Sequence, residues 1–241
     1  MTTTDQHDLR FDVPLYSVAE TAQYLGVPAS TFRTWAKGYV RRPTGGNAVV
    51  GAPVLSVVAQ PGPEASVPFV GLAEGMVLAA IRRSGVPMQR IRPALLELQA
   101  SIGIEHALAS SAIYTDGAEV LYDFAKAHGD DPAAASARDL VVVRNGQRVF
   151  TDVIADYLKR IEYGGDGYAA LVHLPDYRRR QVVVDPDRAF GQPIFVHGGA
   201  RVRDVLDRFQ AGESLTDLAA DFGVPVVELE DAVRVASRRA A

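Results

Sequence analysis

The feature that most constrains this chain is a pattern that occurs twice, once near each end. Residues 24–39 read YLGVPASTFRTWAKGY and residues 221–236 read DFGVPVVELEDAVRVA. In both stretches a large apolar residue precedes Gly-Val-Pro, and a helix-like run follows. Glycine commonly ends a helix, and proline favours the start of the next one. The pattern therefore predicts a helix–turn–helix at each end of the 241-residue chain.

The N-terminal helix pair, residues 17–37, carries its own start and stop signals. Ser17 is placed to cap the first helix, and Glu20 completes a Ser-x-x-Glu capping box. Gly26 ends that helix, and the second helix is expected over residues 29–37.

The C-terminal helix pair, residues 214–237, matches the first in its apolar positions. Aligning Ser17 with Ser214 brings about twenty residues into register, with the same buried positions in both copies. The matched pairs are Ala22 with Ala219, Leu25 with Phe222, Phe32 with Leu229, Trp35 with Ala232, and Ala36 with Val233. Any short helical hairpin with a glycine turn would have this pattern, so the buried positions alone assign no function.

The two pairs differ in the positions expected to face outward. If Phe32 and Trp35 point inward, the opposite face of the second helix presents Ser, Arg, Thr and Lys at helical spacing. Such side chains contact phosphates and base edges of DNA. With Thr31 at its flank and two arginines continuing the positive surface, the candidate DNA-binding residues are Ser30, Thr31, Arg33, Thr34, Lys37, Arg41 and Arg42.

The equivalent outward stripe of the C-terminal helix pair is acidic. It consists of Val227, Glu230, Asp231 and Arg234. Two carboxylates facing DNA phosphates would be repelled, so this pair is expected to serve dimerisation, core support or a protein partner. The candidate protein-contacting residues are Glu230, Asp231, Arg234, Arg238 and Arg239.

The chain between the two pairs alternates helical and hairpin patterns. Residues 41–60 are typical of a β-wing or loop, and residues 70–100 have apolar residues at helical spacing. Thr-Asp-Gly predicts a hairpin turn within residues 112–124, and Asn-Gly predicts a type I′ turn within residues 140–150. Four arginines flank the helical segment and either extend a phosphate-binding surface or form a solvated helix face: Arg82, Arg83, Arg90 and Arg92.

We expect a mainly α protein with short β elements (α+β) and two main parts. The expected domains are a DNA-binding head and wing (1–68), a helical and β-hairpin middle region for dimerisation or core (69–162), a glycine-rich linker (163–180), and a C-terminal helix–turn–helix-like domain (181–241). Three helices are expected to close the chain, over residues 202–210, 215–222 and 226–237.

Composition excludes several classes of function. The chain has no cysteine, which removes thiolate metal sites and thiol nucleophiles and fits a reducing cytoplasm. Its five histidines lack metal-ligand spacing, and no hydrolase or nucleotide-binding motif occurs, so we predict no enzyme, metal or cofactor. No leader and no membrane segment are expected. The net charge of the whole chain is −4, but the charge is unevenly distributed, because residues 29–42 hold four cations and no acid.

The segment SVAETAQYLGVPASTFRTWAKGY resembles the N-terminal DNA-binding head of MerR-type regulators. The segment VDPDRAFGQPIFVHGGARVRDVLDRFQAGESLTDLAADFGVPVVELEDAVRVA resembles a small prokaryotic domain family of unknown function, on its Gly-x-Pro-Ile, Gly-x-Arg-Val and Ala-Gly-Glu-Ser elements. The combination is similar to the larger VapB-type antitoxins of VapBC toxin–antitoxin modules, over nearly the whole chain.

The resemblance implies a homodimer that binds operator DNA, represses its own operon and blocks a PIN-domain ribonuclease. It transfers the DNA contacts to the candidate residues given above. It transfers no clear toxin-contacting motif, because this chain differs from the shorter antitoxins in length, head type and tail. Two alternatives stay open: a toxin-independent regulator whose middle or C-terminal region senses a ligand, and an adaptor that uses both helix pairs for protein contacts.

Overall fold

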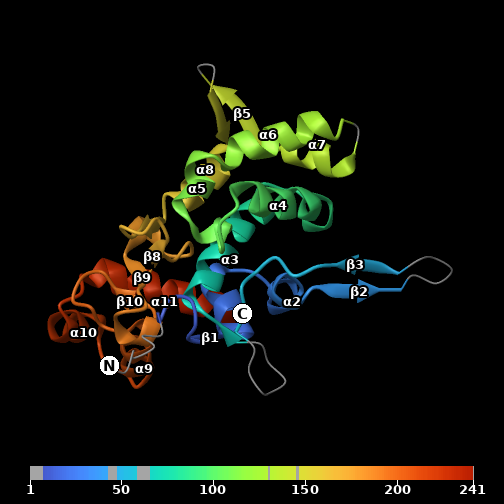
Figure 1. Ribbon diagram of the computed structural model, residues 1–241. Coiled ribbons are helices and arrows are strands. Elements are labelled where there is room, and N and C mark those ends of the chain that lie inside the picture. The colour runs from blue at the N-terminus through green and yellow to red at the C-terminus, as the bar shows by residue number, and fades with distance from the viewer. Residues whose placement is uncertain (1–7, 43–47, 59–65, 130, 145–146, 241) are drawn as a thin grey trace, which may run out of the picture. The chain divides into compact units, whose positions relative to one another are not determined.

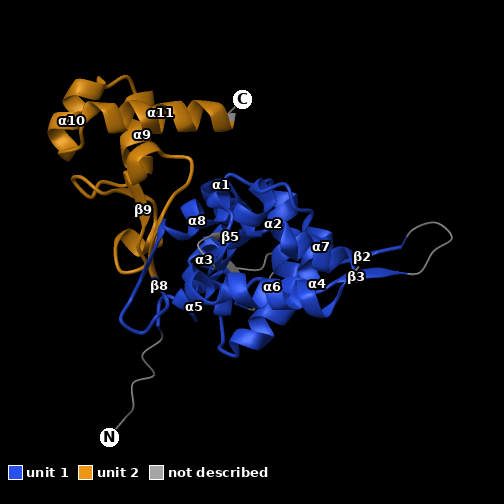
Figure 2. Cartoon of the chain, turned by 90° about the horizontal axis from the view of Figure 1, so that it is seen from above, with its two compact units in different colours: residues 1–169 blue, residues 170–241 orange. Residues whose placement is uncertain are grey.

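The computed structural model describes residues 8–42, 48–58, 66–129, 131–144 and 147–240. The chain divides into two compact units, Met1–Ala169 and Ala170–Ala241, which Figure 2 draws in different colours. The boundary falls within residues 163–180, where the sequence indicates a linker. That range also contains a five-residue strand, β8 (Ala169–His173).

Unit 1 is mainly helical with short antiparallel strand pairs, as Figure 1 shows. Its elements, in chain order, are β1 (Tyr16–Ser17), α1 (Val18–Leu25), α2 (Ala29–Lys37), β2 (Tyr39–Arg41), β3 (Val49–Gly51), β4 (Ser66–Val67), α3 (Phe69–Arg83), α4 (Met88–Ile102), η1 (Ala107–Ala109), α5 (Ser111–Thr115), α6 (Gly117–Ala127), α7 (Pro132–Arg138), β5 (Val141–Arg144), β6 (Gln147–Phe150), α8 (Asp152–Leu158) and β7 (Ile161–Tyr163).

The N-terminal helix pair forms as the sequence predicts. Ser17 Oγ accepts from the backbone N–H of Glu20 at 3.1 Å, and the Glu20 carboxylate accepts from the N–H of Ser17 at 2.9 Å. Gly26 ends α1 in the left-handed conformation, with φ at 65°. Leu25, Phe32 and Trp35 are almost completely buried, so apolar packing fixes which face of α2 points outward.

The wing predicted after α2 is present as strands β2 and β3. They pair antiparallel, with Tyr39 opposite Gly51 and Arg41 opposite Val49. Gly38 makes the bend between α2 and β2 with φ at 70°, and a Cβ there would lie 2.4 Å from the carbonyl oxygen of Gly51. Glycine is therefore required at position 38, both for its backbone conformation and for the close approach of the two strands.

Helix α3 is the central helix of unit 1. Every residue from Phe69 to Ile81 is buried, including Glu74. A Cβ on Gly75 would lie 2.7 Å from a methyl group of Leu25 and 2.8 Å from the ring of Phe32. The absence of a side chain at position 75 therefore lets α3 pack closely against the N-terminal helix pair.

The hairpin predicted over residues 112–124 is wrong, because helices α5 and α6 occupy this segment. Ala118, Leu121 and Ala125 are buried on one face of α6, and this helical spacing outweighs the Thr-Asp-Gly turn signal. Gly117 allows close packing, since a Cβ there would lie 2.7 Å from Ile113 Cδ1.

The second predicted hairpin is confirmed by strands β5 and β6. They pair antiparallel, with Val141 opposite Phe150 and Arg144 opposite Gln147. The Asn-Gly turn expected between them, at 145–146, lies outside the described residues.

Unit 2 contains short antiparallel strands followed by three helices. Its elements after β8 are η2 (Arg178–Arg180), β9 (Val182–Val184), η3 (Ala189–Gly191), β10 (Ile194–Phe195), α9 (Val202–Gln210), α10 (Leu215–Phe222) and α11 (Val226–Ala240). Strand β9 lies between β8 and β10 and is buried along its length. The bounds of α9 and α10 agree with the prediction, and α11 extends three residues beyond it. The mainly α fold with short β elements is confirmed.

The C-terminal helix pair repeats the backbone devices of the N-terminal pair. Ser214 Oγ accepts from the backbone N–H of Asp217 at 3.2 Å, and Gly223 ends α10 with φ at 64°. Leu229, Ala232 and Val235 bury the inner face of α11.

Candidate nucleic-acid interface

The outward face of α2 presents the side chains that the sequence predicts. Ser30, Arg33 and Lys37 are exposed, and Thr31 and Thr34 are half-buried at the edge of the stripe. Thr34 Oγ1 donates a hydrogen bond to the carbonyl oxygen of Thr31 at 2.7 Å. Thr34 is therefore partly engaged within its own helix, and Arg33 and Lys37 are the exposed cations of the stripe.

The N-terminus of α2 favours an anion. Pro28 occupies the N-cap position and its side chain makes no capping hydrogen bond, in contrast to Ser17 at the start of α1. The first turn of α2 contains no acidic residue. Backbone N–H groups at such a helix end carry partial positive charge and bind phosphates well.

The wing continues the positive surface beyond α2. Arg41 is exposed at the end of β2, and Arg42 follows it, also exposed. The outward valines of the wing are exposed too: Val40 by 63%, Val49 by 49% and Val50 by 69%. The wing thus presents two cations next to an apolar ribbon that the rest of unit 1 leaves uncovered.

Arg92 of α4 connects the wing to α2, which the sequence did not reveal. The sequence leaves Arg92 either on a phosphate-binding surface or on a solvated helix face, and the solvated interpretation is wrong, because the residue is only 6% exposed. Its guanidinium donates to the carbonyl oxygens of Ala52, after the wing, and of Thr34, in α2. It also lies over the ring of Tyr39, 5.5 Å from the centroid. Burial lowers the pKa of Arg92, so its charge is held here at a desolvation cost.

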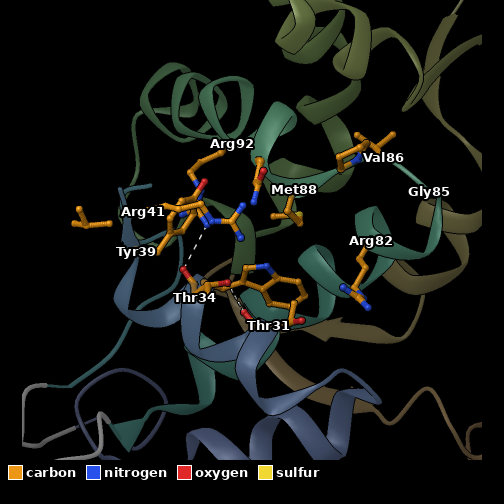
Figure 3. Close-up of a pocket in the computed structure, with 13 residues that line it drawn as sticks. Thr31, Thr34, Tyr39, Arg41, Arg82, Gly85, Val86, Met88 and Arg92 are labelled. Carbon is orange, nitrogen blue, oxygen red and sulfur yellow. Dashed lines mark hydrogen bonds between the residues drawn. The ribbon is translucent and has the colours of Figure 1, made fainter. Parts of the chain in front are cut away.

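A groove of about 630 Å³ opens beside α2. Figure 3 shows Arg41, Tyr39 and Arg92 on one side of it and Arg82 on the other. The turn between α3 and α4 and the start of α4, residues 85–89, supply another part of its lining. Among the thirteen described residues that line the groove there are three arginines and no Asp or Glu, so its electrostatic character suits a phosphate group.

The outward stripe of the C-terminal helix pair is not arranged as expected. Glu230 is exposed, but Asp231 is only 7% exposed. The Asp231 carboxylate accepts from the backbone N–H of Arg178 at 2.7 Å and from Gln181 Nε2 at 2.9 Å, and it pairs with Arg234. The predicted exposure of Asp231 is therefore wrong, because the loop between β8 and β9 covers this part of α11.

The three candidate arginines of α11 have different environments. Arg238 is exposed, Arg234 is half-buried beside Asp231, and Arg239 forms an ion pair with Asp176 at 3.1 Å. Only Arg238 has the exposure that a partner could reach without displacing an internal contact.

Unit 1 also contains a buried carboxylate that local sequence patterns do not predict. Glu74 accepts from the backbone N–H of Ser56 at 2.6 Å and from Ser56 Oγ at 2.9 Å. Ser56 Oγ lies 2.7 Å from His106 Nδ1, and Glu74 raises the pKa of His106. This cluster fastens the segment after the wing to α3. Its only sequence signal is a single acid within an apolar helix.

The described residues show neither a metal centre nor a membrane span. No group of three or more His, Asp or Glu among them is placed to hold a metal ion. None of their helices is long and apolar enough to cross a membrane.

Comparisons with known proteins place the chain in a family. Residues 14–95 match a family model described as "Putative DNA-binding HTH domain", and residues 182–236 match one described as "Protein of unknown function (DUF433)". The chain is 48% identical to "Putative antitoxin VapB45" of Mycobacterium tuberculosis, over 94% of this chain and 95% of that protein. It belongs to the family of larger VapB-type antitoxins.

The chain is also similar to a further sequence and to a solved structure from the same bacterium. The chain is 33% identical to "Uncharacterized protein Rv2308", over 92% of this chain and 90% of that protein. It also resembles the crystal structure of Rv2018, with a TM-score of 0.83 and 45% identity, covering 93% of this chain and all of that one. The DNA-binding family model extends through residue 95, so it includes Arg82 and Arg92 as well as the helix pair and the wing.

Proposed function

We propose that this protein is a cytoplasmic antitoxin that binds operator DNA as a homodimer, represses its own operon and neutralises a PIN-domain ribonuclease. The observation that carries the DNA half is the acid-free outward face of α2 and its wing, within a chain of the VapB-type antitoxin family. The proposal gives the chain no catalytic role, cofactor or metal.

In this proposal α2 enters the major groove of DNA. Arg33 is suited to a bidentate contact with guanine, while Ser30 and Thr31 lie near the helix N-terminus that enters first. Lys37, Arg41 and Arg42 are placed to neutralise phosphates. The arrangement of helix pair, wing and following helices supports this orientation, which is the one expected from the resemblance to MerR-type heads.

The arginine-lined groove beside α2 fits a backbone phosphate adjacent to the bases that α2 contacts. Arg82 and the turn before α4 belong to the segment matched by the DNA-binding family model. A homodimer with two-fold symmetry would place two such heads on half-sites ~34 Å apart, or a multiple of that distance.

For the toxin contact we propose the exposed part of α11 and the arginine-rich turn η2. Glu230, Arg178 and Arg179 are exposed and line a shallow depression of about 220 Å³, with Arg234 at its edge. Because Asp231 is buried there, it supports this surface from within rather than touching the partner.

The DNA half is tested by fluorescence anisotropy with labelled duplex from upstream of the gene and a scrambled duplex of equal length, each titrated at several salt concentrations. We expect the upstream duplex to bind at least 100-fold more tightly at physiological salt, since specific sites exceed non-specific ones by 10³–10⁷ in well-studied systems. Equal affinity for both duplexes would contradict operator recognition.

The toxin half is tested by co-expression with the ribonuclease encoded by the neighbouring gene. We expect a stable complex on size exclusion and loss of ribonuclease activity at equimolar antitoxin. An active, unbound ribonuclease would contradict neutralisation.

A second candidate is a toxin-independent regulator that senses a small molecule. It is supported by a pocket of about 760 Å³ in the middle region, whose lining includes Glu119, Arg148 and Lys159. Charges of both signs would suit a zwitterionic ligand. Specific DNA binding that changes with a metabolite, together with no ribonuclease complex, would favour this candidate.

A further inference from the structure

The most exposed large apolar side chain among the described residues is Phe190, which is 87% exposed. It lies in η3, in the loop that joins β9 to β10. Its backbone is in the left-handed region, with φ at 53° and ψ at 41°, and Ala189 before it has φ at 49°. Residues with a Cβ rarely adopt this conformation, which favours glycine.

The loop that presents Phe190 is held by hydrogen bonds within eight residues. The N–H of Arg188 donates to the carbonyl of Asp185 at 3.1 Å, and the N–H of Gly191 donates to the carbonyl of Arg188 at 3.0 Å. The N–H of Gln192 donates to the carbonyl of Ala189 at 3.0 Å, and that of Asp187 to Asp185 Oδ1 at 2.9 Å. The ring is therefore presented on a pre-organised turn.

The exposed ring and the strained backbone occur at the same residue, Phe190, although neither stabilises the fold of unit 2. A solvated phenyl ring gains no burial energy, and glycine would adopt this conformation more readily. Strained backbone that the surrounding structure enforces is commonly found at binding sites. A rigid aromatic side chain on a pre-organised loop is also the typical anchor of a protein interface, because little conformational entropy is lost on binding.

The charges of the loop distinguish between classes of partner. Residues 185–193 contain two aspartates and one arginine, so the loop carries a net charge of −1. Phosphates of nucleic acid or of an anionic membrane would be repelled by Asp187, which is exposed three residues before the ring. Arg188 is exposed on the same turn and offers a donor to a carboxylate.

We propose that Phe190 is an anchor that inserts into an apolar socket of a protein partner, with Arg188 pairing with a carboxylate at the rim of the socket. This inference rests on the proposed function, because the partner to which we assign the socket is the PIN-domain ribonuclease. It adds an interaction residue outside α11 and η2, the surface assigned above.

The test measures the affinity of the full-length chain and its variants for the purified neighbouring-gene ribonuclease by calorimetry. Phe190→Ala should weaken binding by about 30-fold or more, the range of interface hot spots. Phe190→Tyr keeps the ring and should bind within about threefold of the parent. Tyr114→Ala removes another exposed aromatic ring, in unit 1, and serves as the matched control with unchanged affinity.

The Phe190→Gly variant distinguishes a role of the ring in binding from a role in the stability of the fold. Glycine relieves the left-handed strain, so this variant should unfold at a temperature a few degrees higher while binding the ribonuclease as weakly as Phe190→Ala. A lower unfolding temperature for Phe190→Gly would show that the ring supports the fold, and it would overturn the proposal.

The remaining outcomes are distinguishable. If the parent forms the ribonuclease complex and Phe190→Ala binds equally well, the anchor is refuted while the proposed function stands. If the parent forms no complex with the ribonuclease, both the proposed anchor and the proposed toxin-neutralising function are refuted. If Phe190→Ala changes the oligomeric mass in light scattering, or the affinity for DNA, the ring contacts a second copy of the chain or nucleic acid, and the proposal is again overturned.

Discussion

The two helix pairs share a buried frame and differ in what covers their second helix. Both begin with a serine cap and turn at a left-handed glycine, with φ of 65° at Gly26 and 64° at Gly223. Position 34 is a half-buried threonine at the edge of an open face, whereas the equivalent Asp231 is buried under the β8–β9 loop. The comparison shows that the same turn can leave the face of one helix open and use another helix to hold a loop.

This difference goes beyond charge. The sequence suggests that acidic residues alone keep α11 away from DNA, but Asp231 is also covered by backbone and by Gln181. Reversing the charge of α11 would therefore not create a second DNA-binding face. Substitutions at equivalent positions of the two helix pairs test this difference.

The largest effect is expected at Asp231. Replacing it with Ala leaves the N–H of Arg178 without its acceptor and removes the shorter of the two hydrogen bonds of Gln181 Nε2, and should destabilise unit 2 by about 2–4 kcal/mol. Thr34→Ala, at the equivalent position, should cost under about 1 kcal/mol, the value of one ordinary hydrogen bond. Hydrogen exchange of unit 2 amides measures the destabilisation by Asp231→Ala. Urea unfolding followed by Trp35 fluorescence measures the destabilisation by Thr34→Ala.

Because Trp35 is the only tryptophan, its fluorescence reports on unit 1 alone. The Trp35 transition of Asp231→Ala should match that of the parent. Equal destabilisation by the two substitutions would mean that α11 is as open as α2.

The next effect is on DNA affinity at Arg33. Arg33→Ala should weaken binding to the upstream duplex by about 1–3 kcal/mol and relax the preference at one base position. Glu230→Ala, at the equivalent position of α11, should change it by less than about 0.5 kcal/mol. Anisotropy titrations against single-base variants of the duplex measure both, and an equal loss for Glu230→Ala would place DNA on unit 2 as well.

The glycine turns should respond alike. Gly26→Ala and Gly223→Ala each force a Cβ into a left-handed backbone, which costs about 1–2 kcal/mol. Thermal unfolding of the two variants and the parent tests whether the shared frame is energetically equivalent. A large cost at only one glycine would indicate that the two turns are supported differently by their surroundings.

The smallest expected change is in salt dependence. Lys37→Ala should weaken binding to all duplexes alike and reduce the slope of log affinity against log salt by about 0.9, the value for one phosphate contact. Arg234→Ala, at the equivalent position, should leave that slope unchanged. An unaltered slope for Lys37→Ala would remove Lys37 from the phosphate contacts.

The sequence predicts structural features that depend on neighbouring residues, such as helix caps and turns. It does not predict contacts between residues that are far apart in the chain. The capping box, the glycine turns and the outward positions of Arg33 and Lys37 follow from helical spacing over a few residues, and the structure agrees with each. The error at residues 112–124 arose where a turn signal and helical spacing competed, and burial on one face of α6 decided the outcome.

The missed features are buried polar groups whose partners lie far away in the chain. Arg92 reaches Thr34 and Ala52, which are 58 and 40 positions away. Glu74 is buried against Ser56, 18 positions away. No local pattern reports such contacts, because the same side chains on a solvated helix would look identical in sequence.

The position of Arg92 has a consequence for which DNA sites the head can use. One side chain of α4 holds both α2 and the segment that follows the wing, so the separation between α2 and the wing, the two parts that we propose contact DNA, is set from outside them. A site that required a different separation would have to detach one carbonyl from a buried guanidinium, at a desolvation cost. In the proposed complex, discrimination between operators of different geometry would therefore reside partly in α4, which need not touch a base.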